Sequence, residues 1–147
     1  GFENAYVLDC PEICTRETRH IQGEYVLNID DVFLSREFKD TIGKGSHPID
    51  ISPIPDVLQK HPLPRRWSFN IPYRCLVPKK IDNLLLAGRC ISTTHEASGC
   101  TRVTVQCMIT GEAAGTAAAM CVEKNVKPRN LDTNKLRRKL AEQGVVL

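Results

Sequence analysis

The stretch DNLLLAGRC at residues 82–90, followed after a polar loop by Thr104–Lys124, decides the fold of this chain. The apolar run Leu84–Ala87 does not alternate with polar residues, which is typical of a strand buried on both faces in a parallel sheet. The small-residue segment Thr104–Lys124 predicts a helix of roughly 30 Å, at about 1.5 Å per residue. Together the strand, the loop and the helix form a unit that can bring backbone amides close to a bulky anionic cofactor.

The predicted helix carries two features with different interpretations. Small residues recur along it at four-residue spacing, at Gly111, Gly115 and Ala119. This spacing favours tight packing of the helix on a sheet rather than a direct functional role. The helix start offers unpaired N–H groups and a partial positive charge, which suit an electron-rich carbonyl or a phosphate. We therefore predict cofactor contact at Thr104-Val105-Gln106, with Thr104 as the cap, and packing at the glycines.

Length and composition describe an ordinary globular protein. The chain has 147 residues, of which 41% are hydrophobic and 25% charged, enough to bury a core. Residues 1–74 carry nine Lys/Arg and eleven Asp/Glu, whereas residues 75–147 carry eleven and six. The resulting charges of −2 and +5 suit an anionic cofactor but are too weak to indicate nucleic acid.

The cysteines and the hydropathy pattern narrow the class of protein further. No two of the seven cysteines form a CxxC pair, which argues against a zinc ribbon and a thioredoxin-like redox site. Free thiols in a reducing compartment are the simplest interpretation, so we expect a cytoplasmic protein. No apolar run approaches the ~20 residues of a membrane span, so we expect no membrane association. The cysteines are Cys10, Cys14, Cys75, Cys90, Cys100, Cys107 and Cys121.

The first half of the chain predicts short strands around one helix. Alternation of apolar and polar residues indicates three strands, at Glu24–Ile29, Ile49–Ile51 and Trp67–Ile71. Asp30 and Asp31 are suitable caps for a helix over Val32–Phe38, and Gly43 and Gly45 would break it. The fold class is therefore mixed α/β.

Two further segments complete the predicted fold. Four prolines make residues 52–65 a loop, and two more bracket an extended piece at Tyr73–Val77. A final helix begins after its cap Asp132 and ends at Gly144, with Leu136 and Leu140 on one face.

His95 and Arg102 are the candidate catalytic residues. His95 lies in the predicted loop between strand and helix, and Gly99 rules out an HExxH zinc site there. A histidine at this place could donate a proton or bind substrate, whereas a structural or solvent-facing role is the alternative. Arg102 precedes the helix and could anchor a carboxylate or an oxyanion, with a surface salt bridge as the alternative.

Other polar residues have simpler interpretations. Arg16, Arg19 and Arg74 could line a substrate cleft, but ordinary ion pairing is favoured. Cys90 follows Arg89 at the strand end and could touch the cofactor. Catalytic thiol chemistry needs a partner cysteine or a base that the sequence does not show, so packing of a small residue is favoured for Cys90.

Several motifs along the chain resemble one known family. They are IPYRCLVP at 71–78, NLLLAGRCIS at 83–92, HEA at 95–97, RV at 102–103 and GEAAGTAAA at 111–119. The upstream segments RETR at 16–19, GEY at 23–25 and PIDI at 48–51 are similar to the same family. The chain resembles the C-terminal part of bacterial FAD-dependent oxidoreductases whose flavin domain is of the glutathione-reductase type.

The resemblance implies a two-domain protein and assigns residues to its cofactor. Residues 1–75 would belong to a sheet-rich substrate domain, and 76–147 would supply the last strand and helices of a Rossmann-like FAD domain. Gly88, Arg89 and Cys90 would lie along the ribityl and phosphate part of FAD. The amides of Thr104-Val105-Gln106 would face the pyrimidine edge of the flavin.

The same resemblance implies partners that the sequence does not contain. No GxGxxG loop and no acidic residue for the adenosine ribose are found, so an N-terminal FAD-binding half is expected as a partner. We expect an oxidoreductase that moves hydride or electrons between a small-molecule substrate and FAD when complete, with self-association of this chain alone through its uncovered apolar face. The alternative is a non-catalytic module that binds no flavin and acts through a partner chain.

Overall fold

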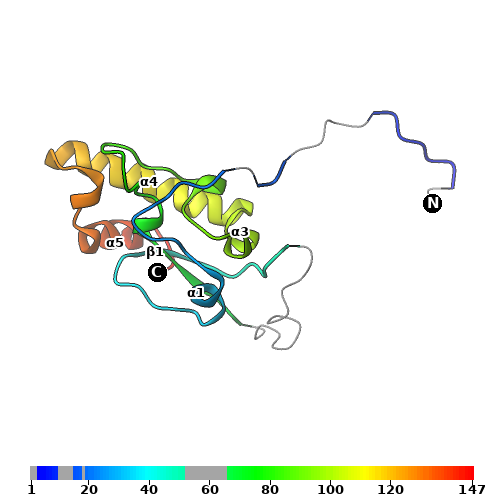
Figure 1. The fold of residues 1–147 in the computed structure, drawn as a ribbon, viewed down its shortest axis with the longest axis horizontal. Coiled ribbons are helices and arrows are strands. Elements are labelled where there is room, and N and C mark those ends of the chain that lie inside the picture. Colours follow the sequence, from blue (N-terminus) through cyan, green and yellow to red (C-terminus); the bar gives the residue numbers. More distant parts are fainter. Residues whose placement is uncertain (1–2, 10–14, 18, 52–65) are drawn as a thin grey trace.

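The computed structural model describes residues 3–9, 15–17, 19–51 and 66–147, and its core is built around one long helix. In Figure 1 this helix, α4, lies along one side of the molecule, and α5, the strands and α1 lie on the other. The helices are α1 (Ile29–Phe33), α3 (His95–Thr101), α4 (Thr104–Lys124) and α5 (Thr133–Glu142). The strands are β1 (Thr41–Gly45) and β2 (Phe69–Pro72), and the 3-10 turns are η1 (Tyr73–Cys75), η2 (Gly88–Cys90) and η3 (Pro128–Asn130). No helix of the described residues is long and apolar enough to cross a membrane.

The two strands form an antiparallel pair beneath α4. Thr41 pairs with Pro72 and Gly43 pairs with Ile71, so the register shifts by one residue between these pairs. The pattern predicted a strand at Trp67–Ile71, and β2 confirms it over Phe69–Ile71. All four residues of β2 are buried, which makes this strand the centre of the core.

Gly43 and Gly45, which were expected to break the predicted helix, lie beyond α1 and within β1. A methyl group on Gly43 would lie 2.3 Å from Cγ2 of Ile109 in α4. A methyl group on Gly45 would lie 2.4 Å from the Phe69 ring. The glycines are therefore used for close approach of the strand to its neighbours rather than for a turn.

Helix α4 has the predicted bounds but a different buried face. Its buried residues are Gln106, Thr110, Ala113, Ala117 and Cys121. Gly111, Gly115 and Ala119 are exposed, and no atom lies within 4 Å of a methyl group built on either glycine. The predicted packing of this stripe on a sheet is therefore wrong within the described residues.

The two ends of α4 differ in how they are capped. The N-cap is Val103 rather than the predicted Thr104, and no side chain caps the helix start. At the other end Asn125 takes a left-handed conformation with φ of 51°, which asparagine tolerates better than most residues.

Helix α5 agrees with the sequence prediction. The Asp132 side chain accepts hydrogen bonds from the amides of Asn134 and Lys135, and Leu136 and Leu140 are fully buried. Gly144 follows the helix with φ of 93°, a value that glycine adopts without strain.

Two of the predicted strands lack a strand partner. Residues Leu84–Ala87 have no regular structure, and the amide of Leu86 makes a 3.0 Å hydrogen bond to the carbonyl of Leu76. Within Glu24–Ile29, Leu27 forms one isolated bridge, with Thr93, and Ile29 already belongs to α1. Because the described residues contain a sheet of only two strands, neither segment can complete a ladder.

Three shorter segments also differ from prediction. Ile49–Ile51 is irregular and is joined to α3 by a hydrogen bond from the Asp50 amide to the Gly99 carbonyl. The predicted helix at Val32–Phe38 lies earlier, as α1, because Asn28 and Asp31 form a capping box. Tyr73–Val77 begins with the turn η1 instead of extended backbone. The predicted loop at 52–65 and two of the cysteines, Cys10 and Cys14, lie outside the described residues.

Candidate active site

The N-terminus of α4 presents three backbone amides without partners in the described part of the chain. The first intrahelical hydrogen bond joins the amide of Cys107 to the carbonyl of Val103 at 3.0 Å. The amides of Thr104, Val105 and Gln106 precede it, and no side chain caps them. These N–H groups carry the positive end of a 21-residue helix, so an anionic or electron-rich ligand atom is stabilised there.

Gln106 adds an unsatisfied polar side chain to this helix start. Gln106 is only 2% exposed, and its Oε1 atom has no hydrogen-bond partner among the described residues. A buried amide oxygen without a donor costs free energy, so it is typically matched by a ligand or a water.

Gly88 is fixed against α4 by the side chain of Thr110. The Gly88 amide donates to Thr110 Oγ1 at 2.9 Å, and that hydroxyl donates in turn to the Gln106 carbonyl at 2.9 Å. Gly88 has φ of 76°, and among the described residues beyond its chain neighbours only Cys107 Sγ, at 3.9 Å, lies within 4 Å of a methyl group built there. The backbone therefore turns sharply beside the helix start and leaves room for a ligand.

Arg89 and Cys90 follow in the turn η2. Arg89 is exposed, and its guanidinium donates to the Thr15 carbonyl at 3.4 Å. Cys90 Sγ donates to the Ala87 carbonyl at 3.3 Å. Burial raises the pKa of the neighbouring Cys107 thiol, with Arg89 lowering and Cys90 raising it. The structure thus brings the predicted cofactor residues together, and Cys107 is held as a neutral thiol.

The sequence predicted that His95 lies in a loop. In the structure it is the first residue of the short helix α3. Thr94 caps this helix by accepting from the Ala97 amide. The His95 side chain is 62% exposed, and its Nδ1 atom lies 2.8 Å from Oε2 of Glu17. The α3 helix therefore presents His95 at the surface, with one ring nitrogen bound to a carboxylate.

Arg102, at the end of α3, is surrounded by acceptors. Its side chain is only 10% exposed, and Nη2 donates to the Asp50 carbonyl at 2.5 Å. Its guanidinium also lies 3.7 Å from Glu17 Oε2 and 3.9 Å from Asp50 Oδ2. Arg102 therefore connects two distant segments of the chain to α3, and it lies on the same carboxylate as His95.

Glu17 joins these residues, and the sequence did not identify it as a site residue. Its second carboxylate oxygen lies 2.9 Å from Nε2 of His20. The sequence signals at this position were the charged run at residues 16–20 and the RETR segment at 16–19. Because His95 lies 78 positions away, the pairing could not be predicted from local sequence.

The pKa of Glu17 gives the stability of the protein a dependence on acid. Partial burial acts to raise this pKa, but the hydrogen bonds and charges of His20 and His95 outweigh burial and hold it below its usual range. A carboxyl group whose pKa is lowered by folding stabilises the folded state at pH values above the pKa that the group has in the unfolded chain. That stability is lost as the pH falls through the folded pKa.

We therefore expect the free energy of unfolding to decrease as the pH falls from the ordinary glutamate range through the lowered pKa of folded Glu17. The variant Glu17→Gln should show a shallower decrease, because it has no proton to take up. Urea denaturation at several pH values measures both slopes. Equal slopes would mean that folding does not lower the pKa of Glu17.

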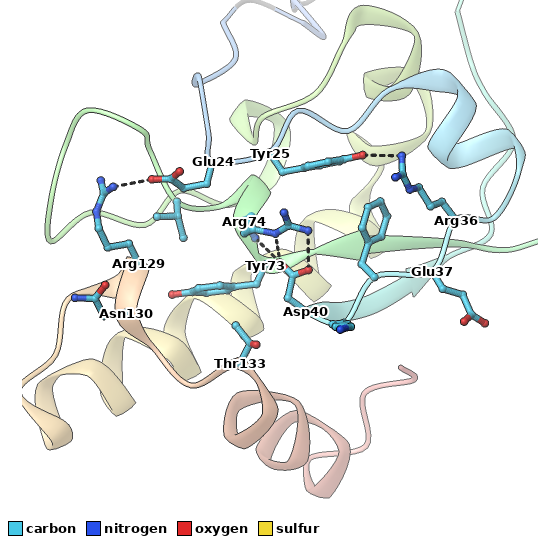
Figure 2. Close-up of a pocket in the computed structure, with 13 residues that line it drawn as sticks. Glu24, Tyr25, Arg36, Glu37, Asp40, Tyr73, Arg74, Arg129, Asn130 and Thr133 are labelled. Carbon is cyan, nitrogen blue, oxygen red and sulfur yellow. Dashed lines mark hydrogen bonds and ion pairs between the residues drawn. The ribbon is translucent and has the colours of Figure 1, made fainter.

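A separate cavity of about 890 Å³ lies away from these residues (Figure 2). Arg74 points into it and forms two hydrogen bonds with Asp40, from Nε at 2.9 Å and from Nη2 at 3.2 Å. Arg129 lies 2.6 Å from the carboxylate of Glu24 on another wall. None of the predicted cofactor or catalytic residues lines this cavity, and the guanidinium groups of Arg74 and Arg129 are already paired with carboxylates. We therefore place the candidate site at the start of α4 and at Glu17.

Ion pairing, the favoured interpretation, is confirmed for two of the arginines considered as substrate ligands. Arg74 pairs with Asp40, and Arg16 lies 3.2 Å from the carboxylate of Asp50.

Comparison with known families identifies one family for this chain. The family model described as FAD dependent oxidoreductase matches residues 1–140. The chain therefore belongs to the FAD dependent oxidoreductases, and FAD is its cofactor. Neither a curated protein nor a solved structure matches it.

Proposed function

We propose that the chain forms the C-terminal part of a glutathione-reductase-type flavoprotein, which transfers hydride or electrons between a small-molecule substrate and FAD. The observation that carries this proposal is the uncapped start of α4 beside the open backbone turn at Gly88. On this division residues 1–75 contribute to a substrate domain and residues 76–147 to the FAD domain.

The residues at the start of α4 fit a flavin cofactor. The amides of Thr104, Val105 and Gln106 suit an electron-rich ring edge, and the orphaned Gln106 oxygen can accept from a ring N–H group. Gly88, Arg89 and Cys90 would hold the ribityl and phosphate part, with Arg89 supplying the positive charge. When bound, FAD supplies the acceptor for hydride or electrons.

His95 and Arg102 are the proposed substrate-side residues. His95 would accept or pass a proton, because its ring is exposed and lies on the helix that precedes α4. Arg102 would stabilise a substrate oxygen or developing negative charge from a nearly buried position.

An apolar face of α4 supports the proposal that another part of the FAD domain covers this chain. Met108 is 68% exposed and Val122 is 84% exposed, with the exposed Gly111 and Gly115 between them. A groove of about 610 Å³, lined in part by Leu85, also runs along the C-terminal half of α4. We propose that a FAD-binding half carrying the phosphate-binding loop packs on this face, and that the chain self-associates in its absence.

Charge reversal at Arg89 tests the cofactor assignment. In the flavoprotein that contains the FAD-binding half, Arg89→Glu should raise the dissociation constant of FAD about tenfold or more, the equivalent of a charge-assisted contact of about 1.5–3 kcal/mol. Titration of the apoprotein with FAD, followed by flavin fluorescence, measures this change. The control is Arg138→Glu, which removes an exposed arginine of α5. If Arg89→Glu and the parent protein bind FAD with equal affinity, Arg89 does not contact the cofactor.

The same titration distinguishes the two functions considered for this chain. A protein that takes up no flavin even with the FAD-binding half present would instead be a non-catalytic module. Flavin absorbance of the purified complex reports this directly.

A further inference from the structure

Glu17 occupies the centre of a polar cluster that connects it and His20 to α3. Its Oε2 atom lies 2.8 Å from His95 Nδ1, and its Oε1 atom lies 2.9 Å from His20 Nε2. Arg102 lies 3.7 Å from the same carboxylate. We infer that Glu17 is a positioning residue for His95, and that it holds the ring so that Nε2 serves as the proton acceptor. This inference rests on the proposed role of His95 in substrate oxidation.

The hydrogen bond to Glu17 decides which tautomer of His95 forms. An ionised carboxylate only accepts hydrogen bonds, so the Nδ1 atom of neutral His95 must carry the hydrogen. The Nε2 atom is then left with a free lone pair, and the 62% exposure of the side chain keeps it accessible. The geometry therefore provides a base at Nε2.

The carboxylate of Glu17 is itself fixed. Its side chain is only 19% exposed, in contrast with an ordinary surface glutamate. His20 is in turn held by the Ile91 carbonyl at 3.0 Å and by Thr93 Oγ1 at 3.2 Å. Ile91 directly follows the turn η2, so the cluster is anchored next to the predicted cofactor residues. Because the Glu17 carboxylate is already fixed, little entropy is lost when it orients the His95 ring.

The two histidines on Glu17 have different roles. His20 uses both ring nitrogens within the protein and is 18% exposed, whereas His95 uses one. Only His95 can therefore exchange a proton with a substrate. The other charged groups facing the pair are Arg102, the Glu96 carboxylate next to His95, and, beyond Arg102, Asp50 and Arg16.

The proton step follows from this arrangement. A substrate O–H or N–H bond breaks, its electron pair stays on the substrate atom, and the proton forms a bond with Nε2 of His95. The ring becomes an imidazolium, and the carboxylate of Glu17 on Nδ1 stabilises its positive charge. The class of substrate implied is one that loses a proton from a hydroxyl or amino group during oxidation.

Nitrogen-15 NMR of the imidazole rings in this chain tests the pairing without flavin or substrate. In the wild-type chain, neutral His95 should have its hydrogen on Nδ1. In Glu17→Ala this preference should be lost, so that Nε2–H becomes the main form. Glu96→Gln is the matched control, since no hydrogen bond joins Glu96 to the His95 ring, and it should leave the tautomer unchanged. A wild-type ring with hydrogen on Nε2, or an unchanged tautomer in Glu17→Ala, would overturn the inference. Glu17→Leu, which has a similar size and no acceptor oxygen, serves if Glu17→Ala does not fold, and it should show the same loss of the Nδ1–H form.

Kinetics of the flavoprotein test whether the pair acts in catalysis. Glu17→Ala should slow flavin reduction by substrate by about tenfold to 10²-fold and change its pH profile. It should add no further loss in a His95→Ala background, because Glu17 acts through His95. Additive losses in the double variant would overturn the inference. A parent rate for His95→Ala would instead refute the proposed function, and the NMR result would still decide whether the pair forms.

Discussion

Replacing Phe69 by alanine should lower the free energy of unfolding by about 3–5 kcal/mol, the largest stability effect expected in this chain. Phe69 is fully buried in β2. Its ring centroid lies 5.3 Å from that of Trp67, and its edge fills the space above Gly45. The variant would leave a cavity that the glycine side of the sheet cannot fill.

Chemical denaturation monitored by circular dichroism measures the loss from Phe69→Ala. The control is Leu34→Ala, which removes a leucine side chain that is 73% exposed and should change stability by less than about 0.5 kcal/mol. Similar losses in both variants would mean that β2 is not the centre of the core.

Replacing His95 by alanine should slow flavin reduction by substrate about 10²-fold or more, the largest functional effect expected. The affinity for FAD should change far less, because His95 lies on α3 and not among the residues assigned to the cofactor. Arg102→Ala should also slow reduction, by removing the charge that would hold a substrate oxygen.

Stopped-flow measurement of flavin absorbance, with FAD affinity measured in parallel, separates these effects. His47→Ala is the control for the loss of a histidine. The ring of His47 is hydrogen-bonded to the carbonyl of the adjacent Pro48. Because Arg102 also bonds to Asp50, the thermal stability of Arg102→Ala has to be measured beside its rate. Parent rates in both His95→Ala and Arg102→Ala would show that these residues are structural.

Local sequence predicted the elements whose signals are themselves local. Helix α4 contains five alanines and no proline, and α5 has an aspartate cap and two leucines one turn apart. Both helices were predicted with nearly correct bounds. The cap of α4 was assigned one residue too late, because a helix start without a capping side chain leaves no signal in the sequence.

Features that depend on distant partners were not predictable in the same way. Leu84–Ala87 has the composition of a buried strand, but a strand forms only beside another, and the described sheet contains none for it. In β1 the glycines looked like breaks, because their close neighbours Ile109 and Phe69 lie far along the chain. Glu17 was missed for the same reason, since its partner His95 lies 78 positions away, in α3.

The contact between Gly43 and Ile109 has a consequence for how this sequence can diverge. A methyl group at position 43 would lie 2.3 Å from Ile109, so Gly43→Ala is disfavoured while isoleucine remains. Ile109→Ala would remove the obstructing atoms and make alanine acceptable at position 43. In an alignment of related chains, the two positions should therefore covary, with a larger residue at 43 accompanied by a smaller one at 109. Substitutions at position 43 of β1 and position 109 of α4 are therefore tolerated together rather than singly.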